Sequence, residues 1–213
     1  MIDEPELTRG YVDPTLRAEF PELALVYTEV PVRPQRSPPA VRARLRTASD
    51  RFTGGKAVTL RQQPIPWAYR VFFRHVGIDP DERRTPIEAI ALERMRAGGF
   101  QSRNLVDDAL LLATLETGVP VLAFDAAAVS GELGVRVSAG GEALGDISVS
   151  AGQVVVADSS RPLAVLFGEI ADGCAVQWSS VRMVLAAVQV KGVPDVSVEE
   201  ALWVAAETVN EGT

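Results

Sequence analysis

The apolar residues of this chain change their spacing near Gly118, and this change limits the fold more than any other feature of the sequence. Before Gly118 they recur at helical spacing, whereas after it they form short runs bounded by Gly, Asp and Ser. The first pattern is typical of amphipathic helices and the second of buried strands. We therefore predict an α+β fold, helix-rich over 1–118 and sheet-rich over 119–213, in which a mixed or sandwiched β-sheet packs against helices.

Start and stop signals set the expected element boundaries. We predict helices that start at Pro14, span 40–52, 64–76, 86–96 and 104–118, and close the chain after a Ser197 cap. We predict strands at 23–30, 119–124, 134–138, 153–157, 162–167 and 183–190. The four prolines between 31 and 39 predict an extended connection.

Length and composition fit one globular unit. The chain has 213 residues, of which 47% are hydrophobic, so a core can form without metals or disulfides. We predict a single domain over 1–213. The N-terminus has no apolar signal segment, and no apolar run approaches the roughly 18 residues of a membrane span. The predicted location is the cytoplasm, with no membrane partner.

The chain holds one cysteine, Cys174, and one histidine, His75. These counts exclude an intrachain disulfide, zinc sites built on cysteine pairs and metal sites with two histidines. We expect no metal and no cofactor. Cys174 is predicted to be a buried apolar residue and His75 a packing residue on a helix.

The net charge of −7 conceals a division along the chain. Residues 1–103 hold 17 Lys and Arg against 13 Asp and Glu, whereas residues 104–213 hold 4 against 15. The first part includes a group of arginines that form either a solvated helix face or a surface for phosphates. The candidates for RNA binding are Arg33, Arg36, Arg42, Arg44, Arg46 and Arg51.

The order of several short motifs resembles a known family. The motifs are SRNLVD at 102–107, LETGVPVLAFD at 115–125, VR with GE at 135–142, VVAD at 155–158 and LAV with GE at 163–169. Together they resemble the B3/B4 domain of the phenylalanyl-tRNA synthetase β subunit. Upstream, Phe20-Pro21, Trp67, the turn at 77–80 and Thr85-Pro86 are similar to freestanding B3/B4 proteins. The resemblance implies the same α+β fold.

The resemblance also implies a site. In the synthetase this domain hydrolyses wrongly attached tyrosine from tRNA, which needs a pocket for the amino acid and an activated water. The family's editing histidine falls at Leu122 here, and a family glutamate falls at about Ala187. The pocket candidates are Arg103, Asn104, Asp107, Leu122, Asp125, Glu142, Glu169 and Ala187, with Arg136 as a further partner for phosphate or carboxylate.

Two main functions remain open, beside a third in which the chain is an interaction domain that keeps only the fold. One is an RNA-linked protein that binds tRNA or aminoacyl-tRNA and hydrolyses a mischarged aminoacyl ester in trans. The other is a non-catalytic binding module for an amino acid-like small molecule, which the absent histidine and glutamate favour. For the loop residues, including Asp125, Asp158 and Glu169, a plain turn role also remains open. The catalytic residues are not identified by the sequence.

Overall fold

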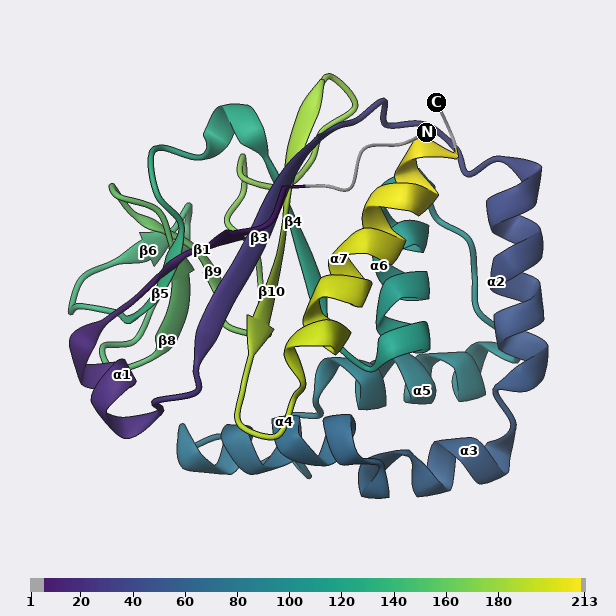
Figure 1. Cartoon of the computed structure of the whole chain (residues 1–213), viewed down its shortest axis with the longest axis horizontal. Coiled ribbons are helices and arrows are strands. Elements are labelled where there is room, and N and C mark those ends of the chain that lie inside the picture. The colour runs from purple at the N-terminus through teal and green to yellow at the C-terminus, as the bar shows by residue number, and fades with distance from the viewer. Residues whose placement is uncertain (1–5, 212–213) are drawn as a thin grey trace.

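The computed structural model describes residues 6–211, with most helices on one side of a β-sheet and a second sheet, together with the short α1, on the other (Figure 1). The helices are α1 (Pro14–Glu19), α2 (Pro39–Arg51), α3 (Gly54–Thr59), α4 (Pro64–His75), α5 (Pro86–Ala97), α6 (Leu105–Thr117) and α7 (Asp195–Asn210). Two short 3-10 helices are η1 (Leu60–Gln62) and η2 (Ala126–Ala128). No helix within residues 6–211 is long and apolar enough to cross a membrane.

The strands form two four-stranded sheets and a small hairpin. The first sheet has the order β1 (Thr8–Arg9), β3 (Ala24–Pro31), β10 (Arg182–Gln189) and β4 (Val121–Asp125), and all its pairs are antiparallel. The second has the order β2 (Tyr11–Val12), β5 (Gly134–Val137), β8 (Val154–Ala157) and β9 (Pro162–Val165), and its β2–β5 pair is parallel. The hairpin consists of β6 (Ala143–Leu144) and β7 (Ile147–Ser148). The predicted α+β fold with a mixed, sandwiched sheet is confirmed.

Residues 8–12 pass from one sheet to the other and so hold the two together. Gly10 lies between β1 and β2, where an added Cβ would come within 2.3 Å of the Leu133 carbonyl oxygen. Such a distance is far inside van der Waals contact, so the crossing requires glycine. A side chain here would push the two sheets apart.

One large apolar core spans the predicted helix-rich and sheet-rich parts. Helix α7 packs against β10, β3 and α6, while α2 lies on the outer side of α6 (Figure 1). The core draws buried residues from both sheets and from helices α1, α4, α6 and α7: Leu16, Leu25, Tyr69, Phe72, Ala109, Val135, Val155, Leu163, Leu185 and Leu202. Cys174 is fully buried beside them, as predicted.

Local signals placed most helix boundaries within two residues. Thr85 and Glu88 form the predicted capping box at the start of α5, and Gly98 ends that helix in the left-handed conformation. The predicted Ser197 cap is wrong, because α7 starts at Asp195, directly after Pro194. The Asp195 carboxylate there accepts hydrogen bonds from Gln189 and Arg9, so distant contacts fix this end of the helix. Strand β4 ends one residue later than predicted, at Asp125.

Candidate functional site

The first turn of α6 supplies the central side chains of the candidate site. Asn104 caps the helix, and its Oδ1 accepts a hydrogen bond from the Asp107 backbone N–H at 2.9 Å. Its Nδ2 donates to the Asp107 carboxylate, also at 2.9 Å. A carboxylate has about four acceptor positions, so this bond leaves Asp107 free to accept others. The cap therefore orients an exposed carboxylate without neutralising it.

The next residue, Asp108, is buried and holds two loops against α6. Its carboxylate accepts hydrogen bonds from the hydroxyls of Ser37 and Ser102, both at 2.6 Å, and from the Arg103 backbone N–H at 2.9 Å. It thereby connects the segment before α2 with the segment before α6. Because the two aspartates are adjacent on a helix, one points into the protein and the other toward solvent.

A cleft of about 380 Å³ lies between α5, α6 and the start of β4, within the range of roughly 300–1,000 Å³ of small-molecule sites. Strand β4 is an edge strand, so its side is open toward this space. Asp107 and Arg103 line the cleft, and Arg103 forms an ion pair with Glu93 at 2.7 Å. The apolar part of the lining includes Ile90, Leu110, Leu111, Pro120, Val121 and Leu122.

A strained turn after β9 closes one side of this cleft. Among residues 6–211, Phe167 is the one non-glycine residue with positive φ, at 54°. Its ring stacks on Phe73, with 5.4 Å between the ring centres, and lies edge-on to Tyr69, with 5.3 Å between the ring centres. Aromatic packing therefore holds a backbone conformation that a bulky residue rarely adopts. At Gly168 an added Cβ would lie 2.5 Å from the Arg83 guanidinium, so the guanidinium rests on the turn.

A second, smaller cleft of about 220 Å³ adjoins the first along α6. Asp107 and Leu110 line both clefts, and Asn104 lines the second. Its other walls include Pro34, Ala123, Ile170 and Trp178. The two clefts therefore adjoin at Asp107 and Leu110, and together they make up the candidate site.

Leu122 and Ala187 do not converge. Leu122 lines the larger cleft, and its cross-strand partner in β10 is Ala186. Ala187 lies opposite Val121 and is fully buried. Since successive side chains of a strand point to opposite faces, Leu122 and Ala187 face opposite sides of the sheet. Ala187 belongs to the core and not to the cleft lining.

Asp125, at the end of β4, has a supporting role beside the site. Its Oδ1 accepts a hydrogen bond from the Ala127 backbone N–H at 3.0 Å, and its Oδ2 accepts one from the Ser180 hydroxyl at 2.7 Å. The Asp125 N–H donates to the Cys174 carbonyl at 2.8 Å. The residue thus anchors the loop over 171–181, which carries Trp178.

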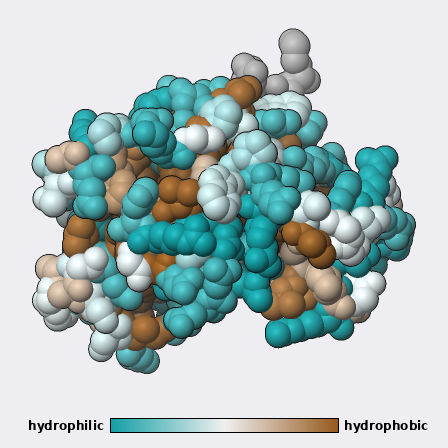
Figure 2. Space-filling view, turned by 90° about the horizontal axis from the view of Figure 1, so that it is seen from below, coloured by the Kyte–Doolittle hydropathy of each residue, from teal (hydrophilic) through white to brown (hydrophobic). Residues whose placement is uncertain are grey.

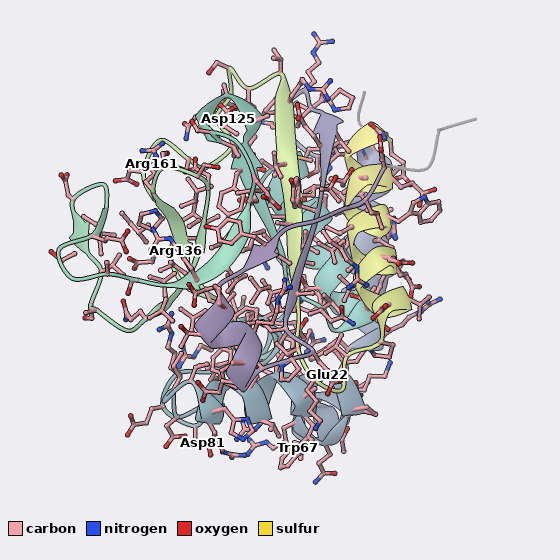
Figure 3. The ribbon with its side chains drawn as sticks, turned by 60° about the vertical axis from the view of Figure 1, so that its left-hand side comes forward. Glu22, Trp67, Asp81, Asp125, Arg136 and Arg161 are labelled. Carbon is pink, nitrogen blue, oxygen red and sulfur yellow. The ribbon has the colours of Figure 1, made fainter. Side chains whose placement is uncertain are left out.

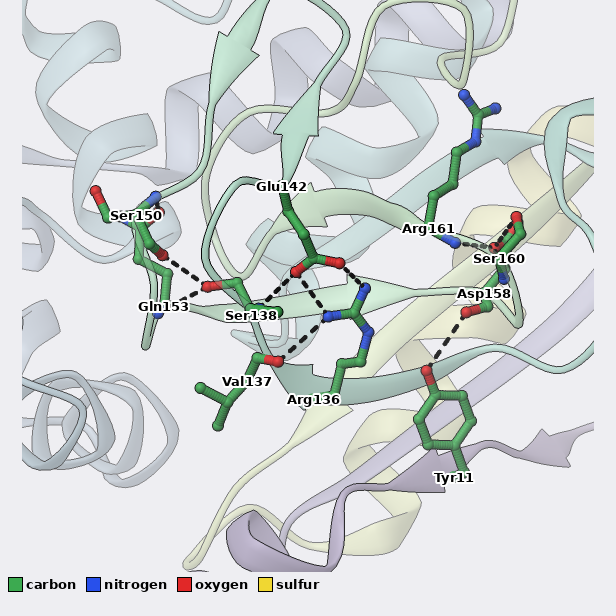
Figure 4. Close-up of polar contacts among 11 residues, drawn as sticks. Tyr11, Arg136, Val137, Ser138, Glu142, Ser150, Gln153, Asp158, Ser160 and Arg161 are labelled. Carbon is green, nitrogen blue, oxygen red and sulfur yellow. Dashed lines mark hydrogen bonds and ion pairs between the residues drawn. The ribbon is translucent and has the colours of Figure 1, made fainter.

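Arg136, in β5 of the second sheet, binds Glu142, which lies just before the β6–β7 hairpin (Figure 4). The guanidinium donates two hydrogen bonds to the carboxylate, at 2.6 and 2.9 Å. The bonds from Arg136 hold the pKa of Glu142 below its ordinary value. Glu142 therefore joins a local pair and lines neither cleft. Glu169 is exposed, between the cleft-lining residues Gly168 and Ile170.

Asp158 is the most densely bonded carboxylate of the second sheet (Figure 4). It accepts hydrogen bonds from the backbone N–H groups of Ser130, Ser160 and Arg161 at 2.7 to 2.9 Å, and from the Ser160 hydroxyl at 2.8 Å. Burial acts to raise the pKa of Asp158, but these bonds together lower it below the ordinary value. Its role is to hold the turn between β8 and β9.

The predicted RNA-binding arginines divide into two groups. Arg44 points inward, where it forms two hydrogen bonds to Glu116 at 2.7 and 2.9 Å and one to Thr208 at 3.2 Å. These contacts connect α2 with α6 and α7. The other predicted arginines are exposed and form no ion pair within residues 6–211: Arg33, Arg36, Arg42, Arg46 and Arg51.

A separate hollow of about 690 Å³ lies between α4, the segment after α1 and the turn after β10. It is lined by Phe20, Trp67, Phe72 and His75, and contains none of the predicted pocket residues. Trp67 and Asp125 lie at opposite ends of the molecule (Figure 3). From below, apolar side chains reach the surface in areas separated by hydrophilic ones (Figure 2). His75 is thus remote from the Asp125 end and packs at 6.3 Å from the Phe20 ring centre.

Sequence reasoning missed three parts of the candidate site. Phe167 and Trp178 were not singled out, and no part in the site was predicted for Asp108. One signal was present for Trp178, which stands in the polar loop segment Gln177–Ser180 and is 69% exposed. No local signal marked the strained turn at Phe167.

Comparison with known proteins identifies the family. The B3/4 domain profile matches residues 68–188, more than half of the chain. The phenylalanine–tRNA ligase beta subunit of Legionella pneumophila (strain Paris) is 37% identical over 89 residues, covering 39% of this chain and 11% of that subunit. That of Xanthomonas oryzae pv. oryzae (strain MAFF 311018) is 34% identical over 94 residues, 42% of this chain and 12% of the subunit. The match thus spans about a tenth of each relative. The chain belongs to the B3/4 domain family.

Proposed function

We propose that this protein binds the 3′ end of aminoacyl-tRNA, with the aminoacyl group in the cleft between α5, α6 and β4. One observation carries the proposal: the oriented Asp107 carboxylate lines both a partly apolar cleft and the smaller cleft that adjoins it. An aminoacyl ester presents the matching groups, namely an ammonium, a side chain and a nucleotide. Relationship to tRNA ligase subunits supports the same class of ligand.

The lining favours an apolar aminoacyl side chain. Leu110, Leu111 and Leu122 contribute methyl groups and have no polar atoms in their side chains. Leu122 cannot form a hydrogen bond with a phenol hydroxyl, whereas a histidine at this position could. The cleft therefore favours a tyrosyl group less than it would with histidine at position 122. A buried hydroxyl without a partner is costly, and aliphatic aminoacyl groups avoid that cost.

Positively charged side chains around the cleft favour the phosphates of a nucleic acid at its rim. Arg84, Arg94 and Arg103 line the larger cleft, and the exposed arginines of α2 lie on the adjoining helix. Phosphates bound by arginine release counterions, so affinity should fall as salt rises. Residues 104–213 carry a charge of −11, so we expect the RNA phosphates to follow the arginines of residues 1–103.

Hydrolysis of the ester requires a base for the attacking water. Asp107 is the carboxylate available for that task. Glu93 is paired with Arg103, and Asp108 is buried with its carboxylate bound by the hydroxyls of Ser37 and Ser102. A carboxylate cannot serve the ammonium and the water equally well. The alternative is therefore a non-catalytic module for an amino acid-like molecule, which Leu122 in the place of the family's histidine favours.

The test uses a panel of aminoacyl-tRNAs with aliphatic and aromatic residues. Affinity is measured on stable 3′-amide analogues, and deacylation on the natural esters. We expect aliphatic aminoacyl-tRNAs to bind more tightly than aromatic ones. The affinity that the aminoacyl group adds should be lost in Asp107→Asn but kept in Asp146→Asn, an exposed control. Equal binding of charged and uncharged tRNA by the wild type would contradict the proposal. A free amino acid that raises Tm, with no tRNA affinity, would instead establish the alternative.

A further inference from the structure

Trp178 is a large aromatic side chain held out into solvent by a fixed loop. It is 69% exposed. Its neighbour Gln177 donates its N–H to the Ser180 hydroxyl at 2.9 Å, and that hydroxyl donates to the Asp125 carboxylate at 2.7 Å. The Ser180 N–H donates back to the Gln177 carbonyl at 3.0 Å. The loop is therefore tied at both sides of the indole to the end of β4.

Two arginines without an ion pair in the described part of the chain lie beside this loop. The Val32 N–H donates to the Val181 carbonyl at 3.0 Å, and the Leu105 N–H donates to the Gln35 carbonyl at 2.9 Å. These bonds hold residues 32–35 between the tryptophan loop and the start of α6. Pro34 and Trp178 consequently line one cleft, while Arg33 and Arg36 stand exposed beside it.

Exposed aromatics next to unpaired cations are what single-stranded nucleic acid binding needs. Bases stack on aromatic rings, and arginines follow the phosphates. We propose that Trp178 is a stacking platform for the unpaired base at the 3′ end of tRNA, with Arg33 and Arg36 contacting its phosphates. This inference rests on the proposed function and extends it, because the Trp178 cleft meets the aminoacyl cleft at Asp107.

The geometry gives the ligand one direction. The terminal ribose would lie near Asp107, where the clefts join, its aminoacyl ester would extend toward Leu122, and its base would turn outward to Trp178. A stacked base is recognised by its flat surface and not by its edge. We therefore expect little preference for the identity of the base, but a clear requirement that a base is present.

The experiment is a double-mutant cycle between protein and RNA. Affinities are measured for a tRNA minihelix with a normal 3′ end and for one whose terminal nucleotide is abasic. We expect Trp178→Ala to weaken binding of the normal minihelix on the order of tenfold and to leave the abasic one nearly unchanged. Trp178→Phe should retain most of the affinity, and Trp203→Ala, at an exposed tryptophan of α7, should bind as the wild type does.

The outcomes separate the two proposals. If the wild type binds the normal minihelix and Trp178→Ala binds it equally well, the stacking platform is wrong and the proposed function stands. If the wild type binds neither minihelix, both proposals fall. A change in self-association in Trp178→Ala, with RNA affinity unaltered, would assign this surface to a second copy of the chain and overturn the inference.

Discussion

At the scale of single residues, Asp158 shows how a turn between strands depends on one carboxylate. Four donors bind it, three of them backbone N–H groups. We expect Asp158→Ala to lower the free energy of unfolding by about 3 kcal/mol, because donors in a buried turn lose their acceptor. Urea denaturation measures this loss. Asp146→Ala, at an exposed position of the β6–β7 hairpin, should change stability little.

The same carboxylate predicts a response to acid. The hydrogen bonds lower the pKa of Asp158 in the folded state, so its ionised form stabilises the fold. That contribution is complete above the unfolded pKa of about 3.9 and is lost as pH falls from there through the lower folded value. Asp158→Asn should therefore flatten the loss of stability in this acid range. Parallel acid unfolding curves for variant and wild type would contradict the assignment.

Residue identity allowed part of the site to be predicted. Asn104 and Asp107 were candidates through the family resemblance, and the structure shows Asn104 capping α6 and binding Asp107. Leu122 was found through the family resemblance alone, since a leucine has no chemical signature of its own. Ala187 was misplaced relative to Leu122 because a shift of one residue along a strand reverses the face, and the position was known only approximately. Trp178 was missed because its exposure depends on the path of the loop.

At the scale of elements, α2 both stabilises the fold and presents free charge. Arg44 binds Glu116 and Thr208 across to α6 and α7, whereas Arg42 and Arg46 are exposed without ion pairs in the described chain. We expect Arg44→Ala to cost roughly 1 kcal/mol of stability, because its two-point bond to Glu116 is lost. Thermal unfolding compares it with Arg42→Ala, which should remain close to the wild type.

For the exposed arginines of α2 we predict an effect on RNA affinity and not on stability. Neutralising Arg42 and Arg46 together should weaken tRNA binding for all species alike and make affinity less dependent on salt. Filter binding at several salt concentrations measures both effects. If the double variant retains the full salt dependence, then α2 is a solvated face and RNA contacts lie elsewhere.

Element boundaries were predictable where residues next to each other in sequence decide them. The capping box of Thr85 and Glu88 is such a case. The start of α7 is different, because Asp195 is held by Gln189 and Arg9 from other elements. The short hairpin β6–β7 and helix α3 gave too few apolar residues for a periodic pattern, so the sequence did not indicate them.

At the scale of the whole molecule, we propose that residues 1–213 unfold as one domain. The main core joins α4, α6 and α7 with strands of both sheets, so neither the helix-rich nor the sheet-rich part buries its apolar face alone. We expect one cooperative transition, with coincident far-UV circular dichroism and tryptophan fluorescence curves. Separate transitions for the two signals would show two units.

The position of the RNA end tests the central claim most directly. A tRNA carrying a photoreactive base at its 3′ terminus is cross-linked to the protein, and the attached peptides are mapped by mass spectrometry. The account predicts attachment within 102–125 and 166–181, two of the segments that line the two clefts, and competition by unlabelled aminoacyl-tRNA. Attachment confined to the hollow at Trp67, or cross-links scattered over the surface without competition, would contradict it.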